Sequence, residues 1–138
     1  MAATLRLEIV TPETRAYSED VEMVVLPGVE GEMGILPMHV PLMTQIKPGE
    51  LVVTKGGQRH HLAVGEGFVE ITQERVSVLT DMAIDERQID ESAAEAAVKR
   101  AEEALKGTEL GGEEAAAVQA ALAKSLAQLH VKRRRRNI

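Results

Sequence analysis

The chain has 138 residues, of which 44% are apolar and 28% are charged, a balance typical of a globular domain with room for a small appendage. It has no cysteine, which excludes a disulfide scaffold and a cysteine zinc site. One Phe, one Tyr and no Trp argue against a surface for stacking on bases or sugars, which needs exposed rings. The net charge of −6 is unevenly spread, because residues 124–138 carry six basic residues and no acidic one.

Residues 1–85 have the pattern of an all-β domain. Leu5, Leu7 and Ile9 alternate with polar residues, as in a strand with one buried face. The run VEMVVL predicts a further strand that stops at Pro27–Gly28. Glycines and prolines between residues 28 and 50 then predict a stretch rich in loops.

The rest of this half predicts short strands joined by turns. LVVT and HLAV flank Gly56–Gly57, a pair that tolerates the positive φ of a tight hairpin turn. GFVEI and RVSVLT follow, and Val76, Val78 and Thr80 alternate in the second of them. Short strands at regular spacing indicate an all-β sandwich or barrel.

Residues 86–138 predict an α-helical hairpin. Asp90 is the expected N-cap of a first helix that ends at Lys106–Gly107, and its apolar residues at helical spacing are Ala94, Ala97, Val98, Ala101 and Leu105. Gly111–Gly112 predicts the turn. A second helix is expected from about Glu113 to Val131, with an apolar stripe formed by Val118, Leu122, Leu126 and Leu129. Because large apolar side chains are few, we expect this hairpin to rearrange when a partner or ligand supplies a few kcal/mol.

No motif in the sequence predicts catalysis or metal binding. His60 and His61 are adjacent on a predicted strand and point to opposite faces, and no metal-ligand spacing of histidines occurs. Gly65–Gly67 lacks the lysine and the following helix of a phosphate-binding loop. His39 is the histidine kept as a candidate, because it lies in a loop rich in proline and glycine.

The run KRRRR, Lys132–Arg136, allows three interpretations: a nucleic-acid contact, a contact with an acidic protein, or a solvated helix end. The acidic body and the lack of aromatic residues favour a protein partner over nucleic acid. No apolar run approaches the roughly 18 residues of a membrane span, and the amino terminus lacks the features of a signal peptide. Any membrane association is therefore expected through partners.

One segment resembles a known family. The sequence GEMGILPMHVPLMTQIKPGEL at residues 31–51 is similar to the ε subunits of F-type ATP synthases. The residues that fit the family pattern are Gly31, Glu32, Gly34, Ile35, Pro37, His39, Pro41, Leu42 and Thr44. The segments LEIVTPE, VEMVVLPG and GEGFVEI and the two-helix end also fall in the family's order, so the resemblance covers the whole chain.

The resemblance implies an amino-terminal sandwich of about ten strands, residues 1–85, that docks on the γ stalk and the c-ring, with Glu32 and His39 in the facing loop. It implies a carboxy-terminal regulatory arm, residues 86–138, that can extend toward the α and β subunits and inhibit ATP hydrolysis. The basic residues expected at the β subunit are Lys124, Lys132, Arg133, Arg134, Arg135 and Arg136. The subunit would itself be non-catalytic and would turn with the rotor, coupling proton flow to ATP synthesis. It would be peripheral to the cytoplasmic face of the bacterial inner membrane, with the plastid thylakoid as the alternative.

Some members of the family bind ATP on the folded arm. Here Ile89, Asp90 and Arg100 match the pattern of such members, together with Ala94, Ala97 and Ala101. Ala93, Lys124 and Gln128 replace three arginines, and Ala93 and Gln128 carry no charge. The loss of guanidinium contacts worth about 1.5–3 kcal/mol each predicts weak ATP binding and no resident cofactor.

Four functions remain to be compared. A rotary coupling and regulatory subunit is the leading interpretation, followed by an ATP-sensing binding module, a freestanding β-domain that binds nucleic acid, and an independent enzyme. Co-purification with γ separates the first from the others.

Overall fold

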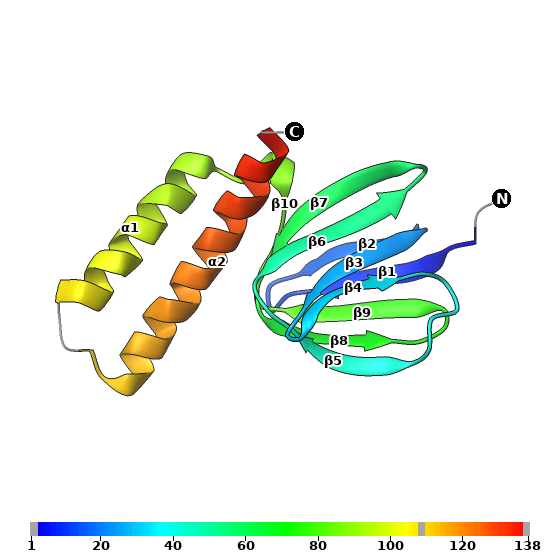
Figure 1. Cartoon of the computed structure of the whole chain (residues 1–138), viewed down its shortest axis with the longest axis horizontal. Helices are drawn as coiled ribbons and strands as arrows, with labels where there is room; N and C mark the ends of the chain where they lie inside the picture. Colours follow the sequence, from blue (N-terminus) through cyan, green and yellow to red (C-terminus); the bar gives the residue numbers. More distant parts are fainter. Residues whose placement is uncertain (1–2, 108–109, 137–138) are drawn as a thin grey trace.

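The β-sandwich and the helical arm lie side by side and are joined by one short 3₁₀ turn (Figure 1). The computed structural model describes residues 3–107 and 110–136, and for Arg135 and Arg136 it describes the backbone only. The ten strands are β1 (Leu5–Val10), β2 (Arg15–Val21), β3 (Met23–Gly28), β4 (Gly31–Ile35), β5 (Leu42–Ile46), β6 (Gly49–Lys55), β7 (Gln58–Val64), β8 (Gly67–Ile71), β9 (Arg75–Thr80) and β10 (Ala83–Asp85). The helices are η1 (Glu86–Gln88), α1 (Glu91–Gly107) and α2 (Gly112–Arg136).

The ten strands form one hydrogen-bonded sheet that folds over itself into two layers. Its order is β10-β7-β6-β3-β5-β8-β9-β1-β2, with β4 paired to β3. All pairings among the described strands are antiparallel except that of β1 with β9. The predicted ten-stranded sandwich followed by a helical hairpin is therefore confirmed.

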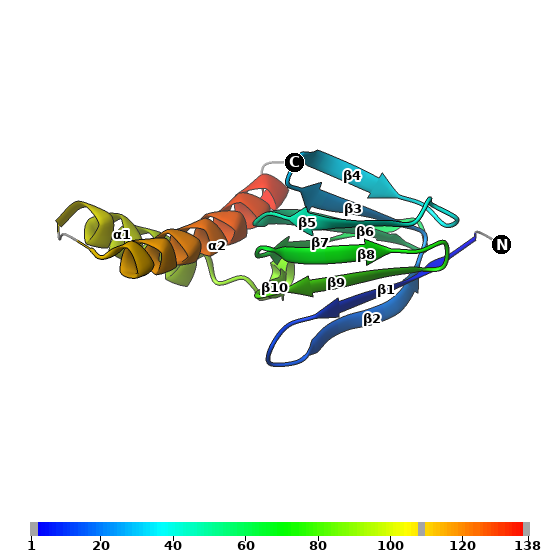
Figure 2. The ribbon, with the colours of Figure 1, turned by 90° about the horizontal axis from the view of Figure 1, so that it is seen from below.

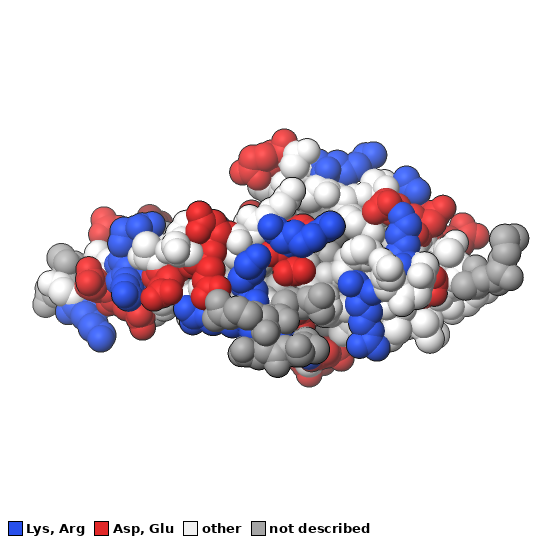
Figure 3. Space-filling view, turned by 90° about the horizontal axis from the view of Figure 1, so that it is seen from above, with Lys and Arg blue, Asp and Glu red and all other residues white. Residues whose placement is uncertain are grey.

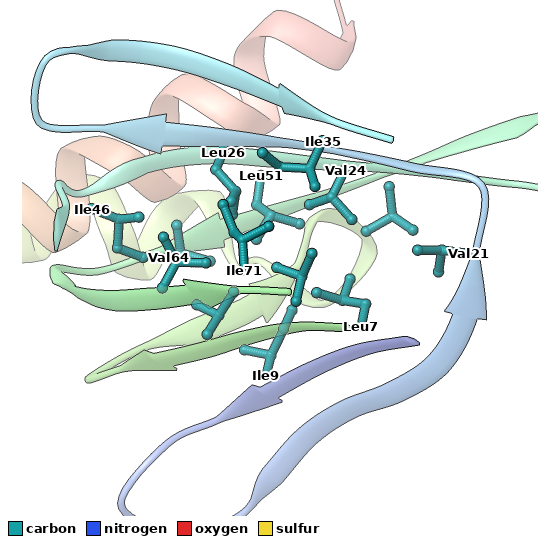
Figure 4. Close-up of a cluster of buried hydrophobic side chains, with 14 of the residues drawn as sticks. Leu7, Ile9, Val21, Val24, Leu26, Ile35, Ile46, Leu51, Val64 and Ile71 are labelled. Atoms are coloured by element: carbon teal, nitrogen blue, oxygen red, sulfur yellow. The ribbon is translucent and has the colours of Figure 1, made fainter. Parts of the chain in front are cut away.

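The inward faces of both layers supply one aliphatic core (Figure 4). Leu7, Leu26, Ile35 and Leu51 are completely buried in it, although they come from four different strands. The buried members of this core are all aliphatic, and Tyr17 packs against it as a partly buried neighbour, so its cohesion comes mainly from close packing of branched side chains.

The predicted alternation matches the burial in detail. Leu5, Leu7 and Ile9 point into the core from β1, whereas the polar residues between them face outward. In β9 the buried residues are Val76, Val78 and Thr80, and the Thr80 hydroxyl donates to a backbone carbonyl, either Glu66 O at 3.1 Å or Met82 O at 3.2 Å. A buried hydroxyl needs such a partner, because an unpaired one would lose its hydration without compensation.

The hairpin predicted at Gly56–Gly57 is also present. Both glycines have positive φ, 59° and 77°, and the flanking residues Lys55 and Gln58 are paired in register. This is the backbone shape of a two-residue turn that matches the twist of its strands.

The prediction for residues 28–50 was wrong in part. This stretch contains β4 and β5. The predicted end of the preceding strand is confirmed, because the last two residues of β3 are Pro27 and Gly28. The run VEMVVL is also divided, because Val21 ends β2 and β3 begins at Met23. The reason lies in close backbone contacts: a Cβ on Gly28 would lie 2.7 Å from the Gly31 carbonyl oxygen, so this glycine makes a tight turn between paired strands possible.

The arm follows the prediction at its start and differs at its end. The Asp90 side chain accepts a hydrogen bond from the Ala93 amide at 3.1 Å, which is the expected N-cap of α1. α2 continues past Val131 to Arg136. Lysine and arginine are good helix formers and their charge is favourable at a helix carboxyl end, so the basic run extends the helix.

The predicted apolar stripe of α2 is only partly buried. Leu129 is buried, but Leu126 is 47% exposed, and the other buried side chains of this helix are Ala127 and Val131. The difference arises because α2 has neighbours on two sides, α1 and the sandwich (Figures 1 and 2), so its buried residues do not follow a single stripe. Val131 packs with Ile89 and Ala63 in a small second core between arm and sandwich.

Candidate functional site

The outward side of β5, β8 and β9, which the arm does not cover, carries exposed apolar side chains beside the polar Gln45 and Glu70. Phe68 and Leu79 are direct cross-strand neighbours, 53% and 55% exposed, and Met43 on β5 is 66% exposed. The arm packs instead on β6 and β7. We call the surface formed by Met43, Phe68 and Leu79 the open face. Exposed apolar groups gathered in this way mark interaction surfaces.

A groove of about 500 Å³ separates α2 from the edge formed by β3, β4 and β6. Its apolar lining comes from Val25, Pro27 and Val52 of the sandwich and from Leu126 and Ala127 of α2. Charged and polar groups at its margin are Glu32, Lys47, Glu50, His130 and Arg134. The groove therefore brings residues of the predicted c-ring loop and of the basic arm close together.

Among the described side chains, two ion pairs join the arm directly to the sandwich. Arg134 Nη1 lies 2.7 Å from Glu50 Oε1, and Lys124 Nζ lies 3.7 Å from Asp81 Oδ2. In addition, Lys132 Nζ donates to the Glu86 carbonyl oxygen in η1 at 3.1 Å. The basic side chains of Lys132 and Arg134, which the structure describes, are thus engaged by groups of their own chain.

A second set of charges holds the two helices of the arm together. Arg133 donates to Glu91 at 3.3 Å and to Glu95 at 3.2 Å, both on α1. Figure 3 shows acidic and basic side chains next to one another along the arm. Six basic residues were predicted at a partner surface. Four of them are engaged within the chain: Lys124, Lys132, Arg133 and Arg134. The side chains of Arg135 and Arg136 lie outside the described residues.

The structure does not bring Glu32 and His39 together. Glu32 is the second residue of β4, at the end nearer the arm, and β4 runs toward the opposite end of the sandwich, where His39 follows it in the loop to β5 (Figure 2). His39 Nδ1 lies 2.6 Å from the Val40 carbonyl oxygen. The adjacent Met38 amide donates to Gln73 O at 2.9 Å, which ties this loop to the turn between β8 and β9.

The three residues of the predicted ATP pattern lie at and beyond the start of α1. Ile89 is 5% exposed and belongs to the small core with Ala63 and Val131, and Asp90 is the N-cap. Arg100 is exposed farther along the helix. Ile89 and Asp90 thus have structural roles.

Sequence reasoning missed the carboxylates that receive the basic side chains. Glu50, Asp81, Glu91 and Glu95 were not singled out, because nothing near them in the sequence indicates a partner so distant in the chain. The signal that was available is the contrast between an acidic body and a basic end.

Within residues 3–107 and 110–136, no group of three or more His, Asp or Glu side chains is arranged to hold a metal ion. None of the described helices has the length and apolar character needed to cross a bilayer.

Comparison with known proteins covers nearly all of the chain. Residues 4–86 match the family model described as the β-sandwich domain of the ATP synthase delta/epsilon chain, and residues 87–133 match its long α-helix domain. The ATP synthase epsilon chain of Dehalococcoides mccartyi is 43% identical over 134 residues, covering 97% of this chain and 96% of the relative. The chain belongs to the ATP synthase epsilon-chain family.

A second curated epsilon chain agrees in sequence, and a solved structure agrees in fold. The epsilon chain of Desulforamulus reducens is 49% identical over 112 residues, which is 80% of this chain and 85% of the relative. A chain in the cryo-EM structure of the Euglena gracilis mitochondrial ATP synthase, OSCP/F1/c-ring, superimposes with a TM-score of 0.75. It is 23% identical, and the match covers 92% of this chain and 80% of that one, so this likeness shows the fold.

The connection between the two parts of this epsilon-family chain is stabilised by Asp85 and Arg87. The Asp85 carboxylate accepts from the Arg87 amide at 2.9 Å, which caps η1, and from Arg87 Nε at 3.1 Å. The Arg87 guanidinium holds the pKa of Asp85 below its ordinary value of 3.8, against the opposing effect of burial. The pair therefore stabilises the fold above the unfolded pKa of Asp85, and this contribution is lost as pH falls through the lowered pKa.

Replacement of Arg87 by Ala should raise the pKa of Asp85 toward 3.8, because its main stabilising contact is removed. An NMR titration of the Asp85 carboxyl carbon measures this shift directly. The free energy of unfolding in urea should be lower than in wild type at neutral pH, and the difference should disappear in strong acid. Arg59→Ala, at an exposed position of β7, is the control and should leave the Asp85 titration unchanged. An unchanged Asp85 pKa in Arg87→Ala would contradict this account of the connection.

Proposed function

We propose that the chain is a non-catalytic rotor subunit of a proton-translocating ATP synthase, which couples proton flow to ATP synthesis and inhibits ATP hydrolysis through its arm. Family membership supports this, and the Euglena gracilis relative of the same fold comes from an F1/c-ring assembly. The observation that carries the proposal is the division of the chain into a sandwich with an uncovered apolar face and an arm packed through a small separate core. The proposed location is peripheral, at the cytoplasmic face of the bacterial inner membrane, with the plastid thylakoid as the alternative.

The open face is the proposed binding surface for the γ subunit. It carries the chain's single Phe, and it lies on the layer away from the arm, so γ can bind there whether or not the arm is docked. The loop of His39 is tied to the turn between β8 and β9 and borders the same layer. We therefore assign His39 to the γ contact. Glu32, which is exposed and has no ion-pair partner among the described residues, we assign to the c-ring contact.

Introducing a carboxylate at the centre of the open face should weaken γ binding. We expect Phe68→Glu to raise the Kd for γ at least about tenfold, since central aromatic residues commonly contribute more than 1 kcal/mol at an interface. Titration calorimetry with purified γ measures the effect. Gln58→Glu adds the same charge at the exposed hairpin tip between β6 and β7 and should bind γ like wild type. Equal affinities of Phe68→Glu and wild type would place the γ contact elsewhere.

The arm is the proposed inhibitory element. We propose that it extends toward the α and β subunits and that Lys124 and Lys132–Arg136 then meet acidic groups of the β subunit. The support is chemical: a helix end that already binds carboxylates of its own chain has the charge and reach to bind those of a partner.

Truncation after Asp85 tests the division of labour. The large core lies wholly within β1–β9, so residues 1–85 should fold and bind γ with an affinity close to that of the full chain. ATP hydrolysis by a motor reconstituted with this fragment should lack the inhibition that the full chain confers. The readouts are γ binding and hydrolysis rate, with the full-length chain as the control. Inhibition that survives the truncation would refute the regulatory role of the arm.

Nucleotide sensing is proposed to be weak or absent. Ala93 and Gln128 have no charge, and Gln128 already donates to the Met82 sulfur at 3.2 Å, so the arm offers few groups for a triphosphate. We expect a Kd for ATP of about 1 mM or weaker in calorimetry, and Ala93→Arg should tighten it by about 1.5–3 kcal/mol. Ala96→Arg, at another exposed position of α1, controls for the added charge. Micromolar binding by wild type would overturn this expectation.

A further inference from the structure

Glu50 is a buried carboxylate that bridges the arm and the sandwich. Its side chain is 8% exposed and both of its oxygens are used: Oε1 lies 2.7 Å from Arg134 Nη1, and Oε2 lies 3.1 Å from His61 Nδ1. His61 lies diagonally across from Glu50 on β7, where its pairing partner is Val52, and its side chain is 11% exposed. The sandwich therefore supplies a fixed acceptor, and α2 supplies the cation.

The remaining charged groups around Glu50 do not replace Arg134. Lys47 and Glu32 line the same groove from the sandwich, and His130 lines it from α2. The described polar contacts of the Glu50 side chain are with Arg134 and His61. If α2 leaves, Glu50 keeps only its contact within the sandwich. Undocking must break the contact between Arg134 and Glu50 and hydrate both groups. The docked state therefore loses the stabilisation of a charge-assisted hydrogen bond when α2 leaves.

We propose that Glu50 is a latch that holds the arm in its docked position by binding Arg134. This inference rests on the proposed function, which assigns Arg134 to the contact with the β subunit. The docked and extended states then differ in which carboxylates the arginine binds. In the docked state it binds Glu50 of its own sandwich, and in the extended state it binds acidic groups of the partner. Inhibition requires the exchange of one set for the other.

This exchange gives the two members of the pair opposite roles in regulation. Arg134→Gln removes the cation from both states, so it loosens the docked arm and also weakens its hold on the partner. Glu50→Gln removes an acceptor from the docked state alone, keeps the shape of the side chain, and leaves the arm's cations intact. Glu50→Gln should therefore favour the extended arm and strengthen inhibition.

The position of the arm can be measured in the isolated full-length chain. Because the sequence has no cysteine, Gln58→Cys with Glu114→Cys gives two unique spin-label sites, one on the sandwich and one on α2, both exposed. We expect Glu50→Gln to raise the ratio of undocked to docked arm about tenfold over the labelled parent, as seen in the distance distribution. Glu70→Gln, an exposed carboxylate on β8 without a described partner, is the matched control and should not change the distribution.

A double-mutant cycle identifies the partner. Glu50→Gln and Arg134→Gln break the same contact, so their combined effect should be clearly smaller than the product of the separate effects. Glu50→Gln combined with Arg133→Gln should be multiplicative, because Arg133 pairs with α1 instead. An unchanged distribution in Glu50→Gln, or multiplicative effects with Arg134→Gln, would overturn the latch. Arg134 is 55% exposed, so its replacement gives a readable variant if Glu50→Gln fails to fold.

Failure of the latch and failure of the inhibitory function are distinguishable. The distance measurement needs no other subunit, so it decides the latch by itself. Hydrolysis by the reconstituted motor is then measured with the same variants. If Glu50→Gln undocks the arm and hydrolysis is inhibited more strongly, both proposals are supported. If it undocks the arm without added inhibition, the latch stands and the inhibitory role of the extended arm is refuted.

Discussion

The contact of Val131 with Ile89 and Ala63 determines where the arm lies. Each comes from a different part of the chain: Val131 from the last turns of α2, Ile89 from the residues before α1, and Ala63 from the outward side of β7. Burying a side chain of this size contributes about 1.5–3 kcal/mol. A contact this small positions a long hairpin but holds it to the sandwich only weakly. The charged contacts around it therefore add a large share of the stability of the docked arm.

The sandwich is built in the opposite way. Its core draws branched residues from both layers, and removing the arm leaves that cluster intact. The chain thus combines a stable part, which presents a constant surface, with a part whose position responds to a few kcal/mol. In the proposed function, this separation lets the sandwich bind γ continuously while the arm changes position.

The sequence predicted those features that depend on local pattern. Alternation identified β1 and β9, the glycine pair identified the hairpin at residues 56–57, and Asp90 identified the start of α1. The strands β4 and β5 were missed because they lie among glycines and prolines, which usually end strands, whereas Gly28 here permits a tight turn between the paired strands β3 and β4. Of the candidate site, the basic end of α2 was visible as composition, but its carboxylate partners were not. The pairing of Arg134 with Glu50 joins residues far apart in the chain, and only the packing of α2 on β6 brings them together.

The parallel pairing of β1 with β9 has a consequence for the biosynthesis of the chain. Arg6 lies opposite Arg75, so the first strand to leave the ribosome waits for nearly the last one before its inner edge is paired. Closing so long a loop is slow in comparison with forming a hairpin or a helix. The nascent sandwich can pair β1 with β2 early, but it holds the other edge of β1 unpaired during most of its synthesis, when an exposed strand edge is prone to aggregate. The arm, whose contacts with the sandwich need the finished β6 and β7, is the last part to settle.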